Sequence, residues 1–137
     1  MSSRAMLGAS ASAYALLRGK RVFMVEDDDR LYCALKDTLN DAGCETFGLF
    51  TAASENLYAV PSSQFDVALV DVSRRDARFA RVIQSLNERG VPMLLITGRS
   101  RTDLPAQLQR RPWLAKPFTE QDLLDGIANV IEQGRSG

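Results

Sequence analysis

Hydrophobic residues follow two alternating patterns along this chain. Largely continuous apolar runs occupy residues 21–26, 66–71 and 91–97, and a shorter one covers 113–115. Such runs are typical of strands that are buried on both faces of a parallel sheet. Between the runs, apolar residues recur at steps of three and four, which predicts amphipathic helices. The alternation predicts an α/β fold in which helices cover both faces of a five-stranded parallel sheet.

Three predicted helices have an apolar stripe, and two of them also have a polar residue that can cap the first turn. Asp28 or Asp29 can cap the first of these helices, and Thr119 can cap the last, with Asp122 as its partner in a capping box. Gly43 ends the first helix. The stripes are Leu31, Leu35 and Leu39; Phe79, Val82, Ile83 and Leu86; and Leu123, Leu124, Ile127, Val130 and Ile131.

The length of 137 residues fits a single domain. We expect a flexible extension over residues 1–19, the domain over 20–133 and a tail over 134–137. Two further helices are expected to be short, one at 55–60 and one, the fourth, in an irregular segment around 104–108.

Composition excludes several classes of function. Lys plus Arg and Asp plus Glu are 17 each, and no compact basic run argues for nucleic acid binding. Histidine is absent, which excludes catalytic triads and metal sites that depend on it. Cys33 and Cys44 form no disulfide or zinc pattern and are expected to be buried reduced thiols. No run approaches the roughly 20 apolar residues of a membrane span, and a cytoplasmic location is expected.

Four predicted strands end in polar residues, namely Glu26-Asp27, Asp71, Thr97 and Lys116. In a parallel sheet these ends lie at one edge, where open α/β sheets place their ligands. Each residue alone would more often cap a helix or form a salt bridge. The ordered set instead favours a functional site. Because clustered carboxylates repel one another, they indicate a hard divalent cation such as Mg²⁺.

This arrangement suits phosphoryl transfer to a carboxylate. Asp71 is the candidate nucleophile and phosphoacceptor, and Thr97, Lys116 and a metal ion would neutralise the transferring group. An aspartate-dependent phosphatase is disfavoured, because Ser73 stands where such enzymes commonly place a second acid. A flavodoxin-type cofactor binder is disfavoured too, since no phosphate-binding loop follows the first strand.

The motifs VEDD, VALVDV, LLITG and LAKPF occur in the order found in receiver domains of two-component signalling, and residues 20–133 resemble such a domain. The resemblance implies the strand order 2-1-3-4-5. It also implies Mg²⁺ held by Asp27, Asp71 and the backbone carbonyl of Ser73, with Glu26 acting through water.

The resemblance further implies that Asp71 receives its phosphoryl group from a histidine kinase or a histidine phosphotransfer protein. Such a protein signals to a downstream protein, with no nucleic acid or membrane partner, and catalyses only its own phosphorylation and dephosphorylation. Trp113 matches the family's switch aromatic, and the alternative is a core aromatic. A phosphorylation-independent interaction module and a receiver excised from a hybrid histidine kinase are the alternative functions.

Two departures from the family pattern concern the loops. Residues 72–76 replace the usual Met-Pro turn, and Thr97 and Lys116 are 116 − 97 = 19 residues apart, a few fewer than is typical. The missing residues shorten the fourth helix and its loop. The chain is similar here to a subset of receivers, many of them single-domain and paired with HWE-type histidine kinases.

Overall fold

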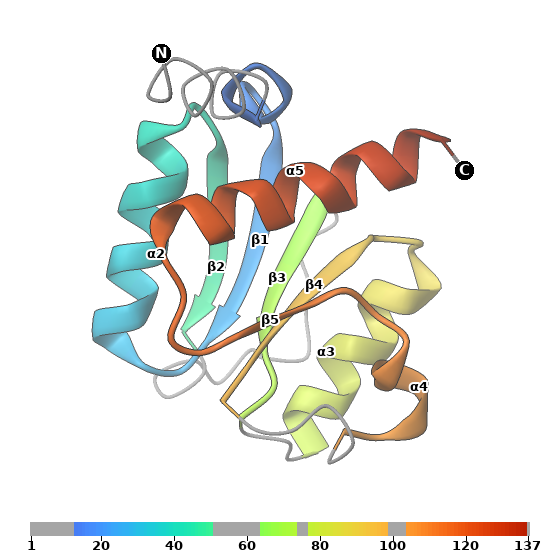
Figure 1. Cartoon of the computed structure of the whole chain (residues 1–137). Helices are drawn as coiled ribbons and strands as arrows, with labels where there is room; N and C mark the ends of the chain where they lie inside the picture. The colour runs from blue at the N-terminus through green and yellow to red at the C-terminus, as the bar shows by residue number, and fades with distance from the viewer. Residues whose placement is uncertain (1–12, 51–63, 74–76, 99–103, 137) are drawn as a thin grey trace.

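The computed structural model describes residues 13–50, 64–73, 77–98 and 104–136, and its five strands form one parallel sheet (Figure 1). The strand order is β2-β1-β3-β4-β5, which confirms the predicted fold and topology. The strands are β1 (Arg21–Glu26), β2 (Glu45–Phe50), β3 (Val67–Asp71), β4 (Met93–Thr97) and β5 (Trp113–Ala115).

Besides a short helical segment at residues 13–17, the described part has four helices that connect and cover these strands: α2 (Asp29–Asp41), α3 (Ala77–Glu88), α4 (Ala106–Gln109) and α5 (Glu120–Ser136). The fourth predicted helix is indeed short, because α4 has only 4 residues and lies between Pro105 and Pro112. The helix expected at 55–60 lies outside the described residues. The expected tail is partly helical, since α5 continues to Ser136.

Two apolar clusters lie on the two faces of the sheet, because alternate side chains of each strand point to opposite faces. On one face Val22, Met24 and Leu69 pack with α2 and α5. On the other face Phe23, Val70 and Leu95 pack with α3 and with Leu108 of α4. β3 is buried along its whole length, as its continuous apolar run predicts.

Side-chain caps fix where α2 and α5 begin. Asp28 caps α2 by accepting a hydrogen bond from the Leu31 N–H at 3.1 Å. At α5 the predicted capping box is present: Thr119 Oγ1 accepts from the Asp122 N–H at 3.0 Å, and Asp122 Oδ2 accepts from the Thr119 N–H at 3.1 Å. Both helices therefore start immediately after strand ends that carry candidate site residues.

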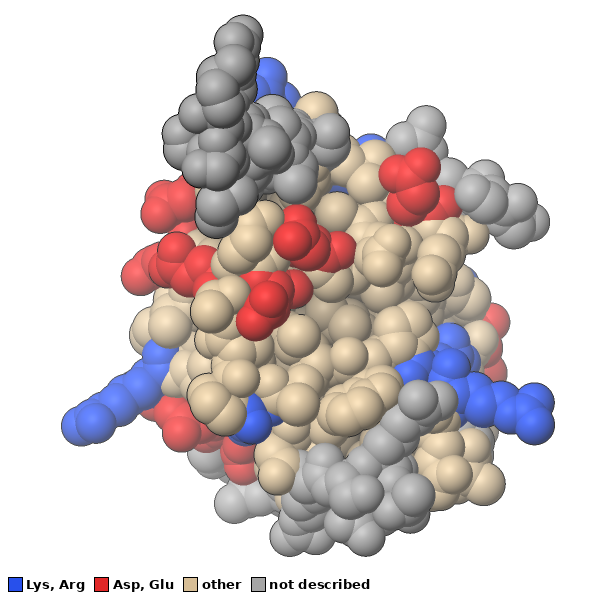
Figure 2. All heavy atoms as spheres, in the orientation of Figure 1, with Lys and Arg blue, Asp and Glu red and all other residues tan. Residues whose placement is uncertain are grey.

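The face made by α2 and α5 is rich in acidic side chains (Figure 2). The acidic residues of α5 are Glu120, Asp122, Asp125 and Glu132. The zero net charge of the chain thus conceals an uneven distribution, and this face offers little to a polyanion.

The N-terminal extension is packed where the structure describes it, in contrast to the flexible segment expected from the sequence. Residues 13–17 are helical, and Ala13 and Leu17 belong to the core cluster beneath α2 and α5. The Gly19 N–H donates to the Gly43 carbonyl at 2.8 Å, and the Cys44 thiol donates to the Leu17 carbonyl at 3.5 Å. The folded unit therefore begins before residue 20.

Leu17→Ala is expected to lower the free energy of unfolding by about 2–5 kcal/mol, because Leu17 is completely buried. Tyr14→Ala, on the same helical turn, is the matched control: Tyr14 is 41% exposed, and the change should stay within about 0.5 kcal/mol. Urea denaturation of the full chain measures both. Equal, small effects would show that this turn contributes nothing to the fold.

Candidate functional site

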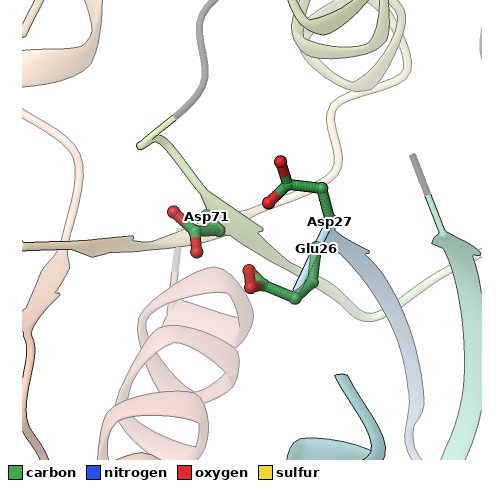
Figure 3. A group of neighbouring side chains, drawn as sticks. All are labelled: Glu26, Asp27 and Asp71. Carbon is green, nitrogen blue, oxygen red and sulfur yellow. The ribbon is translucent and has the colours of Figure 1, made fainter. Parts of the chain in front are cut away.

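The carboxyl ends of four strands meet at one edge of the sheet, as predicted. In the register of the sheet, Val25 pairs with Val70, and Thr97 pairs with Ala115. Glu26 and Asp71 each stand one residue beyond the first pair, and Lys116 stands one beyond the second. Carboxylate oxygens of Glu26, Asp27 and Asp71 lie within 4.8 Å of one another, and the three side chains converge (Figure 3).

Asp71 is buried and held on both oxygens. Lys116 Nζ donates to Oδ2 at 2.7 Å, and the Ser73 N–H donates to Oδ1 at 2.8 Å. Burial acts to raise the pKa of Asp71, but hydrogen bonds from Glu26, Lys116 and Ser73 outweigh it and lower this pKa to about 2. Asp71 is therefore an ionised carboxylate at neutral pH, aimed at the edge of the sheet.

The pKa of Glu26 is shifted in the opposite direction. It is 2% exposed, and burial first, then the neighbouring Asp71 carboxylate, raise its pKa to about 9. One oxygen accepts from the Asp28 N–H at 3.3 Å, while Oε2 is buried without a partner within the described residues. A proton on Glu26 would give Oε2 a hydrogen bond to donate to Asp71. Without a cation, the pair thus shares one negative charge.

Lys116 and Thr97 complete the edge. Burial is the largest single influence on the pKa of Lys116 and acts to lower it. The hydrogen bond to Asp71 and the negative charge of nearby carboxylates together outweigh burial and raise this pKa. Thr97 is 1% exposed, and its carbonyl accepts from the Lys116 N–H at 2.9 Å. The backbones of β4 and β5 therefore fix both residues beside Asp71.

The donor set fits a hard divalent cation. It consists of carboxylate oxygens only, and one of them is buried without a partner among the residues that the structure describes. Oxygen ligands of this kind suit Mg²⁺, which takes one or two carboxylates directly and keeps several waters. A cation here would also offset the repulsion from Asp71, which adds to the effect of burial in keeping Glu26 protonated.

Comparison with known proteins agrees with this geometry. No family model matches the chain. The transcriptional regulatory protein CiaR of Streptococcus pneumoniae is 28% identical over 122 residues, which cover 85% of this chain and 53% of that protein. The chain thus spans about half the length of this curated relative.

Solved structures of response regulators also resemble this chain. A CheY-like receiver domain from Methanospirillum hungatei superposes with a TM-score of 0.71 at 22% identity, covering 86% of this chain and 98% of that one. The BeF3-activated conformation of SdrG from Pseudomonas melonis has a TM-score of 0.65 at 27% identity, covering 81% and 95%. The chain has the fold of a response-regulator receiver domain.

In this receiver-domain fold the acid pair, Asp71, Thr97 and Lys116 all lie at the predicted edge. The resemblance gives Ser73 a role only through its backbone carbonyl, as a metal ligand. In the structure its backbone N–H also donates a hydrogen bond to Asp71. Trp113 lies at the other end of β5 and is 38% exposed, so its interpretation as a core aromatic is wrong. Its role as a switch stays a prediction.

Gly98, the last residue of the LLITG motif, is exposed, and a Cβ atom built on it would lie 3.9 Å from Cδ of Lys116. Among the described residues, no helix is long and apolar enough to cross a membrane.

Proposed function

We propose that this receiver accepts a phosphoryl group on Asp71 and signals through a protein partner. One observation supports this function most directly: Asp71 is a buried, ionised carboxylate held between a lysine ammonium and a backbone N–H, beside two further acids. A carboxylate that is kept ionised and oriented in this way is suited to be a nucleophile.

Each residue at the edge has a part in this proposal. Asp71 attacks the phosphorus atom, while Lys116 and the Thr97 hydroxyl stabilise charge on the equatorial oxygens. Asp27, Asp71 and the Ser73 carbonyl would hold Mg²⁺, with Glu26 acting through water. When bound, Mg²⁺ supplies the positive charge that lets an anionic donor approach the three acids.

The phosphoryl donor is proposed to be a histidine kinase or a histidine phosphotransfer protein. These 137 residues contain no histidine, so the phosphohistidine would come from another domain or another protein. Whether the receiver stands alone or belongs to a hybrid kinase does not alter this chemistry. A phosphorylation-independent interaction module is the competing function, and it predicts no phosphoryl uptake.

Incubation with acetyl phosphate and Mg²⁺, followed by intact-protein mass spectrometry, tests the proposal. We expect one added phosphoryl group, its suppression by EDTA, and its mapping to the peptide that contains Asp71. A protein that binds Mg²⁺, as judged by thermal stabilisation, but takes up no phosphoryl group would support the phosphorylation-independent module instead.

Trp113 permits a separate test of the switch. It is the one tryptophan of the chain and is part-exposed at the start of β5, so its fluorescence reports locally. If phosphorylation moves β5, titration with beryllofluoride and Mg²⁺ should change the intensity or the emission maximum. A constant signal, while calorimetry detects beryllofluoride binding, would rule Trp113 out as the switch aromatic.

A further inference from the structure

A fourth carboxylate borders the site without belonging to the group of three that converges on it. Asp28 directly follows the acid pair and is exposed. Its backbone N–H donates to Glu26 Oε1 at 3.3 Å, and its Oδ1 accepts from the Leu31 N–H at 3.1 Å as the cap of α2. These two bonds hold Asp28 beside the acids, so its negative charge has a defined position.

The charge of Asp28 reaches the lysine of the site. Burial acts to lower the pKa of Lys116, whereas the nearby carboxylates, that of Asp28 among them, act to raise it. Lys116 Nζ lies 2.7 Å from Asp71 Oδ2. A charge that acts on this ammonium therefore also acts on a phosphoryl group that is about to bond to Asp71.

Negative charge exceeds positive charge among the described residues at this edge. The ammonium of Lys116 faces four carboxylates, those of Glu26, Asp27, Asp28 and Asp71. Glu26 Oε2 is buried without a partner among the residues that the structure describes, which points to a cation as a ligand of the edge. A divalent cation would balance this set only in part, and Asp28 is the acid that lies outside the converging group.

We propose that Asp28 is a specificity-determining residue, whose charge makes the site discriminate among phosphoryl donors by their net charge. Acyl phosphates are dianions at neutral pH, so Asp28 repels them more strongly than a protonated phosphoimidazole, whose ring carries a compensating positive charge. The proposal rests on Asp71 being the phosphoacceptor, and it adds that the site favours a phosphohistidine over small acyl phosphates.

Both kinds of donor react by the same step. An Asp71 oxygen forms the new bond to phosphorus, the bond between phosphorus and the leaving group breaks, and its electron pair remains on the leaving atom. Acetyl phosphate releases acetate, phosphoramidate releases ammonia from its protonated amine, and a protonated phosphoimidazole releases neutral imidazole. Phosphoramidate thus has the net charge of the protonated phosphohistidine group without its ring, and it is as small a donor as acetyl phosphate.

Initial rates of labelling by acetyl phosphate and by phosphoramidate, at saturating Mg²⁺ and low ionic strength, test the proposal. They are compared by intact-protein mass spectrometry for wild type, Asp28→Asn and Asp28→Ser. Asparagine and serine can both cap α2, so these changes remove the charge and keep the cap. We expect the ratio of the acetyl phosphate rate to the phosphoramidate rate to rise by about twofold to fivefold in both variants, as for one unit charge acting through partly solvated surroundings. High salt should diminish this rise.

Asp29→Asn is the matched control. Asp29 is the next acid of the chain, but its Oδ1 accepts from the thiol of the exposed Cys33 at 4.0 Å, one turn further along α2. This variant should keep the wild-type ratio. Beryllofluoride is an anion that transfers nothing, and calorimetry with Mg²⁺ should show that Asp28→Asn binds it about twofold to fivefold more tightly than wild type does.

An unchanged ratio in Asp28→Asn, or an equal rise in Asp29→Asn, would overturn the proposal. Loss of labelling by both donors in both Asp28 variants would overturn it too, because the site would then require Asp28 for every donor. Failure of the proposed function is a different result, in which neither donor labels the wild-type protein.

Discussion

Asp71→Asn is expected to take up no phosphoryl group from acetyl phosphate, phosphoramidate or a phosphohistidine protein, whereas wild type is expected to take up one. The amide is close in size to the carboxylate, and its oxygen can still accept from Lys116 or from the Ser73 N–H. It lacks the negative charge and the nucleophilic oxygen that form the bond to phosphorus. Intact-protein mass spectrometry under saturating donor and Mg²⁺ measures the loss.

Asp66→Asn is the matched control for this substitution. Asp66 directly precedes β3, so it lies at the opposite end of this strand from Asp71. There it accepts a hydrogen bond from the Arg21 N–H at 2.8 Å. This variant should be phosphorylated as wild type is. An adduct that persists in Asp71→Asn, on Asp27 for example, would show that another carboxylate is the acceptor.

The position of Asp71 is predictable from the sequence because burial leaves a simple pattern. β3 is covered on both faces, so its residues cannot alternate, and the first carboxylate after the run marks the end of the strand. The same reasoning places Glu26 and Thr97. Topology then brings these residues together, because the carboxyl ends of parallel strands share one edge.

The prediction that Cys33 is buried is wrong, although the sequence holds the information to correct it. Leu31 and Leu35 define the buried stripe of α2, and Cys33 is two residues from each of them, which places it on the opposite face of a helix. Cys33 is exposed, while Cys44 is buried as expected. The packing of Leu17 is different: a single turn has too few residues for a periodic pattern, so only contacts with distant residues reveal it.

The division of charge between Glu26 and Asp71 lies beyond sequence patterns. Repulsion between clustered acids predicts that one of them has a raised pKa, but both stand at strand ends with similar neighbours in the chain. Asp71 keeps the charge because Lys116 and the Ser73 N–H contact it, whereas Glu26 is buried with an oxygen that has no partner among the described residues. These contacts depend on atomic positions that no spacing rule specifies.

Glu26→Gln is expected to raise the free energy of unfolding of the metal-free protein at pH 8, and to do so much less at pH 5. The ordinary pKa of a glutamate is 4.5, whereas the pKa of Glu26 in the folded protein is about 9, so between these values the unfolded chain has lost a proton that the folded protein retains. Wild-type stability therefore falls as pH rises through this window, by up to about 1.4 kcal/mol per pH unit. Glutamine does not titrate and removes this contribution.

Urea denaturation in EDTA at several pH values between 5 and 9 measures the difference. Asp71 does not confound it, because its pKa of about 2 makes its own contribution present above pH 4 and lost only in acid. Mg²⁺ should stabilise wild type more at pH 8 than at pH 6, as the cation lets Glu26 ionise, and should stabilise Glu26→Gln less. Parallel stability curves for wild type and Glu26→Gln in EDTA would show that Glu26 is already ionised at neutral pH and that the cluster has another way to relieve its charge.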